Sequence, residues 1–167
     1  VNETVDMTAI SDTGWATFTI DITIDASRAG QLIQFGFNNR ATSYQSSAVF
    51  YDNVSVAEVE PPAEASFVFS EDFEAFDVTA AQIAGWAHFV NAFTPTGDYI
   101  GGGGGAAPNG GNISNVTSGA AGVDQGVQYL NVFSNYGDNA NHDAGNTLET
   151  SVYREFVIAE TDAGSYR

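Results

Sequence analysis

The chain has 167 residues, 43% of them hydrophobic, which is enough for one domain with a single buried core. Its 21 acidic residues outnumber the four arginines, and the net charge of −17 repels nucleic-acid phosphates and anionic membrane surfaces. Cysteine is absent, which excludes disulfides, thiolate metal sites and cysteine nucleophiles. No apolar run approaches the roughly 20 residues of a membrane helix. We therefore expect neither a nucleic-acid partner nor membrane insertion.

Alternating apolar and polar residues predict several strands in the first third of the chain. The clearest alternation runs over residues 16–25, where Ala, Phe and Ile alternate with Thr and Asp. Residues 31–56 predict two further strands joined by a polar turn. Their expected inward faces are Ile33, Phe35 and Phe37 on the first, and Phe50, Val54 and Val56 on the second. Strands that follow one another without helices favour an antiparallel β-sandwich.

The second part of the chain begins after an acidic, proline-containing linker at residues 60–66. Strand-like sequence resumes at Phe67, and further strands are expected over residues 127–134 and 147–158. Between them, residues 94–126 are rich in glycine, with five consecutive glycines at 101–105. This composition predicts a long loop.

Two short stretches resemble a known family. The run FYDNVSV at residues 50–56 resembles the last strand of jelly-roll carbohydrate-binding modules of the galactose-binding-like type. The run FVFSEDFE at residues 67–74 resembles the opening strand of the same modules. The resemblance implies that residues 1–59 are the C-terminal half of a module and residues 67–167 the N-terminal half. Together they would form one all-β, antiparallel jelly-roll sandwich with its halves in permuted order.

Two arrangements of the halves follow from this order. They pair within one chain as a circularly permuted sandwich, or they complete neighbouring copies by domain swapping or strand complementation. The family would have further residues between the end and the start of this sequence. A sandwich closed within one chain is therefore expected to carry a gap or an open edge.

The resemblance also implies a structural calcium site. In such modules, acidic residues of the first and last strands commonly hold the ion, and the matching positions here are Asp52, Glu74 and Asp72. Carboxylate and carbonyl oxygens are the ligands that Ca²⁺ prefers. The alternative is that Asp52 only accepts hydrogen bonds from backbone N–H groups and that Glu74 is solvated. Asp52 and Glu74 meet only if the two halves pair.

Sugar binding would need aromatic platforms beside amide and carboxylate groups, because pyranose faces are apolar and their edges are polar. The candidates lie in polar loops: Tyr44, Tyr99 and Tyr136, with Asn135 and Asp138 nearby in sequence. For each tyrosine a packing role is the alternative. Trp15 and Trp86 resemble core tryptophans of these modules, and we expect both to be buried.

Catalysis has little support in the sequence, and we expect no enzyme. There are only two histidines, and neither a G-x-S-x-G nor an H-E-x-x-H motif occurs. Among 21 carboxylates, some pair will always lie at the spacing of a glycosidase, so such a pair is not evidence.

These features predict a non-catalytic, extracellular or cell-surface structural protein. It would be a building block of a filament, matrix or surface assembly in which β-sandwich modules complement one another, with copies of itself or neighbouring modules as partners. The alternative is a calcium-dependent polysaccharide-binding module attached to a secreted enzyme or adhesin.

Overall fold

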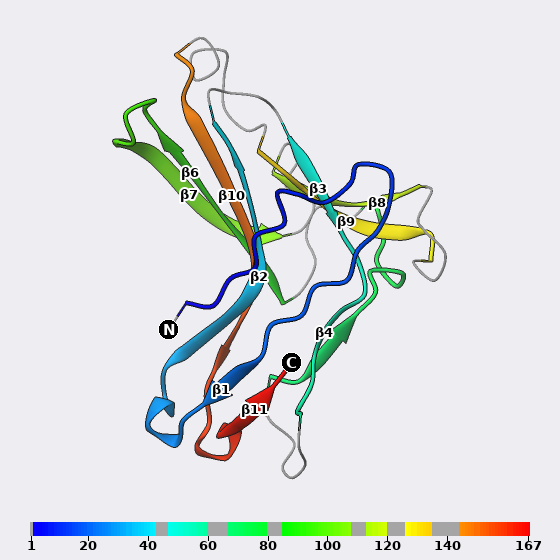
Figure 1. The fold of residues 1–167 in the computed structure, drawn as a ribbon, viewed down its shortest axis with the longest axis vertical. Coiled ribbons are helices and arrows are strands. Elements are labelled where there is room, and N and C mark those ends of the chain that lie inside the picture. The colour runs from blue at the N-terminus through cyan, green and yellow to red at the C-terminus, as the bar shows by residue number, and fades with distance from the viewer. Residues whose placement is uncertain are drawn as a thin grey trace.

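The computed structural model describes residues 2–42, 47–59, 67–79, 85–107, 113–119, 126–134 and 144–167. In these residues the fold is all-β, with antiparallel strands and no α-helix, consistent with a β-sandwich (Figure 1). The strands before the linker are β1 (Ile22–Ile24), β2 (Leu32–Ala41), β3 (Ala48–Tyr51) and β4 (Val54–Val56). Those after it are β5 (Phe69–Glu71), β6 (Trp86–Phe93), β7 (Tyr99–Ala107), β8 (Ser114–Ser118), β9 (Gln128–Phe133), β10 (Thr147–Val157) and β11 (Gly164–Tyr166). Two short 3-10 helices are η1 (Ala26–Arg28) and η2 (Glu160–Asp162).

Each strand that precedes the linker pairs with a strand that follows it. The pairs are β1–β11, β2–β10, β3–β9 and β4–β5. The sheet that contains β2 has the order β2-β10-β6-β7, and the sheet that contains β3 has the order β3-β9-β8. Within the described residues, the two parts of the chain are therefore interleaved and do not form separate sheets.

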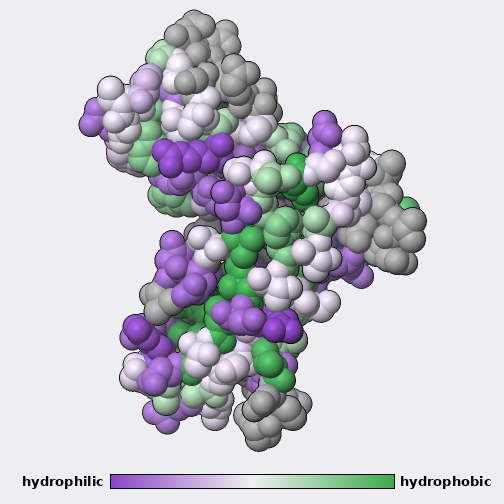
Figure 2. Space-filling view, in the orientation of Figure 1, coloured by the Kyte–Doolittle hydropathy of each residue, from purple (hydrophilic) through white to green (hydrophobic). Residues whose placement is uncertain are grey.

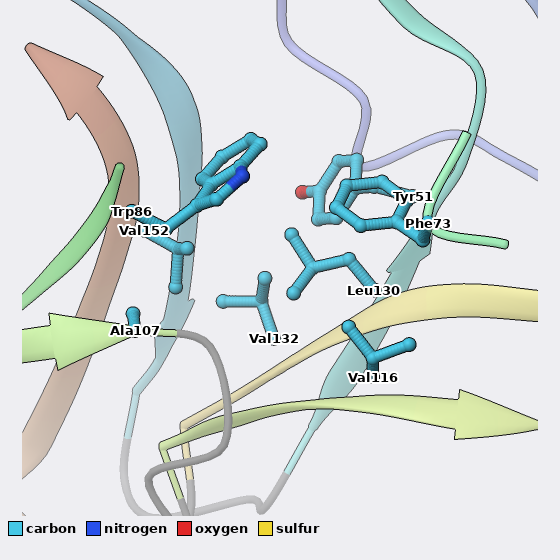
Figure 3. Close-up of a cluster of buried hydrophobic side chains, with 8 residues drawn as sticks. All are labelled: Tyr51, Phe73, Trp86, Ala107, Val116, Leu130, Val132 and Val152. Atoms are coloured by element: carbon cyan, nitrogen blue, oxygen red, sulfur yellow. The ribbon is translucent and has the colours of Figure 1, made fainter. Parts of the chain in front are cut away.

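The buried side chains form two clusters, and both combine residues from before and after the linker. The first lies between the four-stranded and the three-stranded sheets (Figure 3) and contains Tyr51, Phe73, Trp86, Ala107, Val116, Leu130, Val132 and Val152. The second lies around β1, β4 and β11 and contains Ile24, Val56, Phe67, Ile158 and Tyr166. Neither part of the chain closes a core of its own in the described residues.

The predicted inward face of residues 48–56 is wrong at one position. Phe50 is 49% exposed, whereas its neighbour Tyr51 is buried and Val56 is only 7% exposed. The alternation changes phase at the two residues between β3 and β4, where Asn53 has a left-handed φ of 51°. An irregularity of this kind shifts the side chains that follow it to the other face.

The glycine-rich region is not one long loop, because β7 and β8 lie within it. Gly101–Gly105 pairs with β6 along an edge of the four-stranded sheet. The Phe89 ring lies against Gly104, where an added Cβ would come within 3.0 Å of that ring. Glycine propensity is unfavourable in a strand, but the regular neighbour β6 supplies a hydrogen-bonding partner along the whole run.

The strand predicted over residues 16–25 is much shorter in the structure. Only Ile22–Ile24 is a strand, and it is the part that pairs with β11. Residues 15–21 make no backbone hydrogen bond within the described parts of the chain. They form the dark-blue coil that reaches β1 in Figure 1. Of the two tryptophans, Trp86 is 4% exposed, as predicted, whereas Trp15 is only partly buried and meets the edge of Tyr129.

Candidate functional site

The pairing of β4 with β5 brings the three predicted metal ligands into one neighbourhood. Asp52 lies between β3 and β4, and Asp72 and Glu74 follow β5 directly. The charges of Glu74 and Asp72 both act on the carboxyl of Asp52. Residues from the two sides of the linker therefore share this acidic turn, which we define as residues 52, 53 and 72–74.

The pKa of Asp52 is raised from 3.8 to about 6, mainly by burial and to a smaller extent by the negative charges of Glu74 and Asp72. One hydrogen bond opposes this effect, because the backbone N–H of Asn53 donates to Asp52 Oδ1 at 2.8 Å. The other carboxylate oxygen, Oδ2, is buried and has no hydrogen-bond partner among the described residues. A buried carboxylate oxygen without a donor is costly unless it is protonated or bound to a cation.

Glu74 is held by backbone groups and not merely solvated. Its Oε1 accepts hydrogen bonds from the N–H groups of Val127 and Gln128, each at 2.7 Å. The Gln128 side chain donates in return to the Glu74 carbonyl at 2.8 Å. Gly126, with a φ of 66°, passes so close that an added Cβ would overlap Glu74 Oε1. Glu74 thereby fastens the start of β9 to the end of β5.

The backbone of the acidic turn adopts a conformation that few residues tolerate. Asn53 and Phe73 have φ values of 51° and 58°, and they are the non-glycine residues with positive φ in the described parts of the chain. Phe73 is fully buried in the first hydrophobic cluster, which compensates for the unfavourable backbone of a bulky residue there. Its N–H donates to Glu71 Oε1 at 3.0 Å, and the N–H of Glu74 donates to Asp72 Oδ1 at 3.2 Å.

The donor chemistry of the turn fits a hard cation at Asp52, but the carboxylates do not converge. Asp52 Oδ2 is the group that a cation would satisfy, and the neighbouring carboxylates are oxygen donors of the kind that Ca²⁺ prefers. However, no group of three or more His, Asp or Glu side chains in the described parts of the chain is arranged to hold a metal ion. An ion at Asp52 would need backbone carbonyls or water to complete its coordination.

Of the candidate sugar-binding residues, only Tyr99 can be placed. Tyr44, Asn135, Tyr136 and Asp138 lie outside the described residues. Tyr99 begins β7, is 60% exposed, and meets the Phe93 ring edge-on with 5.9 Å between ring centroids. Tyr99 therefore presents an exposed aromatic ring. That the other candidate residues lie beside it stays a prediction.

A cleft of about 1260 Å³ lies on the face of the described structure that Figure 2 shows. Its lining includes residues 15–21 and 49–56, the side chains of Ile33, Phe35 and Phe37 on β2, and residues 151–153 of β10. Residues 2–4, 7 and 10 of the N-terminal segment also line it. Figure 2 shows hydrophobic residues in the hollow at the middle of this face. We call the gap between residues 15–21 and 48–56 the lane.

Lower in the molecule, β11 already occupies this gap. β11 pairs with β1 on one side, and Tyr166 forms an antiparallel bridge to Glu58 on the other. Arg167 and Ala57 exchange two backbone hydrogen bonds of 2.8 Å, and the Arg167 side chain pairs with Asp21 at 2.7 Å. Above Arg167, the described residues place no strand in the lane.

Sequence reasoning did not locate the lane. The signal was present in residues 16–24, whose alternation is longer than the strand that it forms. The strained backbone of Phe73 had no sequence signal, because a phenylalanine in a predicted strand implies an ordinary extended conformation.

Comparison of the chain with protein-family models, with curated proteins and with solved structures gives no match. No helix in the described residues is long and apolar enough to cross a membrane.

Proposed function

We propose that this protein is a non-catalytic structural subunit of an extracellular or cell-surface assembly, in which β-sandwich modules complement one another. The observation that carries the proposal is the lane, an apolar cleft with an extended segment of unpaired backbone at its border. Exposed strand edges recruit further strands, and soluble proteins normally cover or charge them. In a subunit that assembles through this edge, the partner would cover it, so the single copy leaves it open.

The finer fold that supports this proposal is a jelly roll with permuted halves, closed within one chain. The interleaved pairing across the linker and the two mixed clusters support it. The proposal places the protein outside the cell, where salt screens the self-repulsion of a chain with net charge −17.

Sedimentation velocity over a range of protein and salt concentrations tests the assembly. We expect dimers or larger species whose population rises with protein concentration and with salt. A protein that stays monomeric throughout, with residues 15–21 protected from proteolysis, would contradict the proposed function.

The second candidate function is calcium-dependent binding of a polysaccharide. It is favoured by the orphaned Oδ2 of Asp52 and by the exposed ring of Tyr99. Affinity electrophoresis in gels that contain algal or microbial polysaccharides tests it. We expect Tyr99→Ala to lose the retardation, and Val157→Ala, a control at another 60% exposed position, to keep it. No retardation of the unaltered protein by any polysaccharide would reject this candidate.

A structural calcium ion at Asp52 belongs to either function. Hard oxygen ligands are available there, and binding would relieve the cost of the buried carboxylate. We expect calcium to raise the unfolding temperature, chelation to reverse the change, and Asp52→Asn to abolish it. Equal calcium effects in the variant and the parent would place the ion elsewhere.

A further inference from the structure

A buried hydrogen-bond donor without an acceptor lines the cleft. Trp86, the first residue of β6, is 4% exposed, and its ring nitrogen Nε1 makes no hydrogen bond within the described parts of the chain. A buried indole N–H usually has a partner, because leaving it unpaired costs free energy. Since Trp86 lines the cleft, its N–H is a group that a ligand bound there can satisfy.

Tyr51, at the end of β3, brings a second polar group to the same place. It lines the cleft, is 7% exposed, and stacks on Phe37 with 3.9 Å between ring centroids. Figure 3 shows its hydroxyl and the Trp86 ring nitrogen turned toward each other, although no hydrogen bond joins them. Burial raises the pKa of Tyr51 to about 12, so its hydroxyl keeps its proton at neutral pH and stays a donor. Two donors from different sheets therefore face the same space.

The cleft continues from these donors along an apolar floor. Phe37, Phe35 and Ile33 point inward from β2 and line the cleft, yet all three are only half-buried. Over the four residue steps from Phe37 to Ile33 the floor is about 13 Å long. Small-molecule sites in proteins have this composition, a mainly apolar wall with a few placed polar groups.

We propose that the cleft binds a neutral, elongated apolar molecule with one carbonyl or ester oxygen. The N–H of Trp86 and the hydroxyl of Tyr51 donate hydrogen bonds to that oxygen, and the apolar part of the molecule lies along β2. The inference goes beyond the proposed assembly and does not rest on it, because a single copy of the chain contains the whole cleft.

The charges around the cleft favour a neutral ligand. Asp21 and Asp52 both line it, and the whole chain has a net charge of −17, so a carboxylate or phosphate head group is repelled. An ammonium head group has only donors, and it cannot pair with the N–H of Trp86 or the O–H of Tyr51 as donors. A neutral oxygen acceptor meets neither obstacle.

The N-terminal segment covers part of the cleft and can adjust to a ligand. Residues 2–21 include no strand or helix, although Met7 packs against the first cluster and Trp15 against Tyr129. Phe18 and Ile20, which line the cleft, are still 41% and 40% exposed. A ligand can therefore bury further apolar surface beneath this segment, and no sheet pairing has to break.

Two neutral dyes test the binding by fluorescence titration. Nile red carries a carbonyl oxygen, and N-phenyl-1-naphthylamine has no oxygen. Trp86→Phe keeps an aromatic ring but removes the N–H donor. We expect saturable binding of both dyes to the parent protein, and in Trp86→Phe a dissociation constant about five- to tenfold higher for Nile red but within about twofold for N-phenyl-1-naphthylamine.

Trp15→Phe is the matched control, because it makes the same change at the other tryptophan of the cleft lining. We expect it to leave both dissociation constants within about twofold of the parent values. Tyr51→Phe removes only a hydroxyl and keeps the test valid if Trp86→Phe fails to fold; we expect it to weaken Nile red about two- to fivefold. Absence of saturable Nile red binding, or equal weakening of both dyes in Trp86→Phe and Tyr51→Phe, would overturn the inference.

Displacement of Nile red tests the ligand class. We expect 2-dodecanone, a neutral ketone, to displace the dye at about tenfold lower concentration than the dodecanoate anion, whose charge the protein repels. Equal or stronger displacement by dodecanoate would contradict a neutral ligand. None of these outcomes decides the assembly, which sedimentation tests separately.

Discussion

The lower and upper parts of the gap between the N-terminal segment and residues 48–59 differ in one respect. In the lower part, β11 lies between β1 and the chain at Ala57, and a closed aromatic cluster packs beneath it. In the upper part, residues 15–21 carry the same alternation of apolar and polar side chains as β1, but no described strand lies between them and residues 48–56.

The difference teaches that alternation alone does not make a strand. Residues 16–24 keep one pattern throughout, yet only Ile22–Ile24, opposite β11, is paired. Strand structure depends on a neighbour that accepts its hydrogen bonds, whereas a helix satisfies its own backbone. The unpaired part of the segment therefore shows where a neighbour is missing.

The largest expected change in stability comes from removing a buried aromatic ring in the closed part, and the matched removal of an exposed ring in the open part serves as the comparison. Phe67 is fully buried, with its ring 4.7 Å from that of Tyr166 and 5.6 Å from that of Phe35. We expect Phe67→Ala to lower the free energy of unfolding by about 3–5 kcal/mol, because a large cavity remains. The matched change Phe18→Ala removes a ring that is 41% exposed, and we expect a loss below about 1 kcal/mol in the monomer.

Urea unfolding at low salt, where the monomer is favoured, checks both values. Similar losses in the two variants would mean that the lane is closed in solution and that the comparison is wrong. If Phe18→Ala loses more unfolding free energy at high salt than at low salt, the contrast between the two parts is strengthened, because association of copies would then bury the ring.

A smaller effect is expected from the acidic turn, whose residues 52 and 53 lie between β3 and β4 at the border of the lane. The pKa of Asp52 is about 6 in the folded protein and 3.8 in its ordinary state, so the folded protein binds the extra proton between these pH values. Stability should therefore fall as the pH rises from about 4 to about 6 and stay lower above that range.

Asp52→Asn removes the ionisation, and we expect it to raise the free energy of unfolding near pH 7 by about 1 kcal/mol, a value reduced for partial solvent screening. Unfolding curves between pH 4 and 8, a range chosen to bracket the shift, provide the measurement, in a chelator-containing buffer. Asp12→Asn, an exposed position with the same change in charge, is the control. A pH dependence that persists in Asp52→Asn would assign the proton to another group.

The sequence predicted the parts of the fold that depend on local pattern and on regular neighbours. β9 and β10 lie within one residue of their predicted bounds, because each has a partner along its length. The predictions failed where tertiary context overrides local preference. The glycines at 101–105 are in a strand because β6 pairs with them, and Phe50 turns outward because Asn53 interrupts the alternation.

Part of the candidate site could also be anticipated. Asp52 stood out because an acidic residue inside a strand pattern needs a partner, and the structure places it near Asp72 and Glu74. The role of Glu74 could not be foreseen, since its partners at Val127 and Gln128 are distant in sequence. Its contact with them depends on the register of β5 and β9, which no local pattern encodes.

The smallest expected effect concerns the ion pair at the boundary between the two parts of the gap. Arg167 and Asp21 are joined at 2.7 Å, but their side chains are 60% and 62% exposed. Exposed pairs of this kind contribute little, because water and salt screen them and ordering two side chains costs entropy. We expect Arg167→Gln, Asp21→Asn and the double variant to unfold at nearly the parent temperature, with no coupling between the two changes.

A double-mutant cycle followed by thermal unfolding at low and high salt measures the coupling. A clear coupling at low salt that disappears at high salt would show that the pair holds β11 in the gap, and that the boundary of the lane depends on charge as well as on the backbone hydrogen bonds to Ala57.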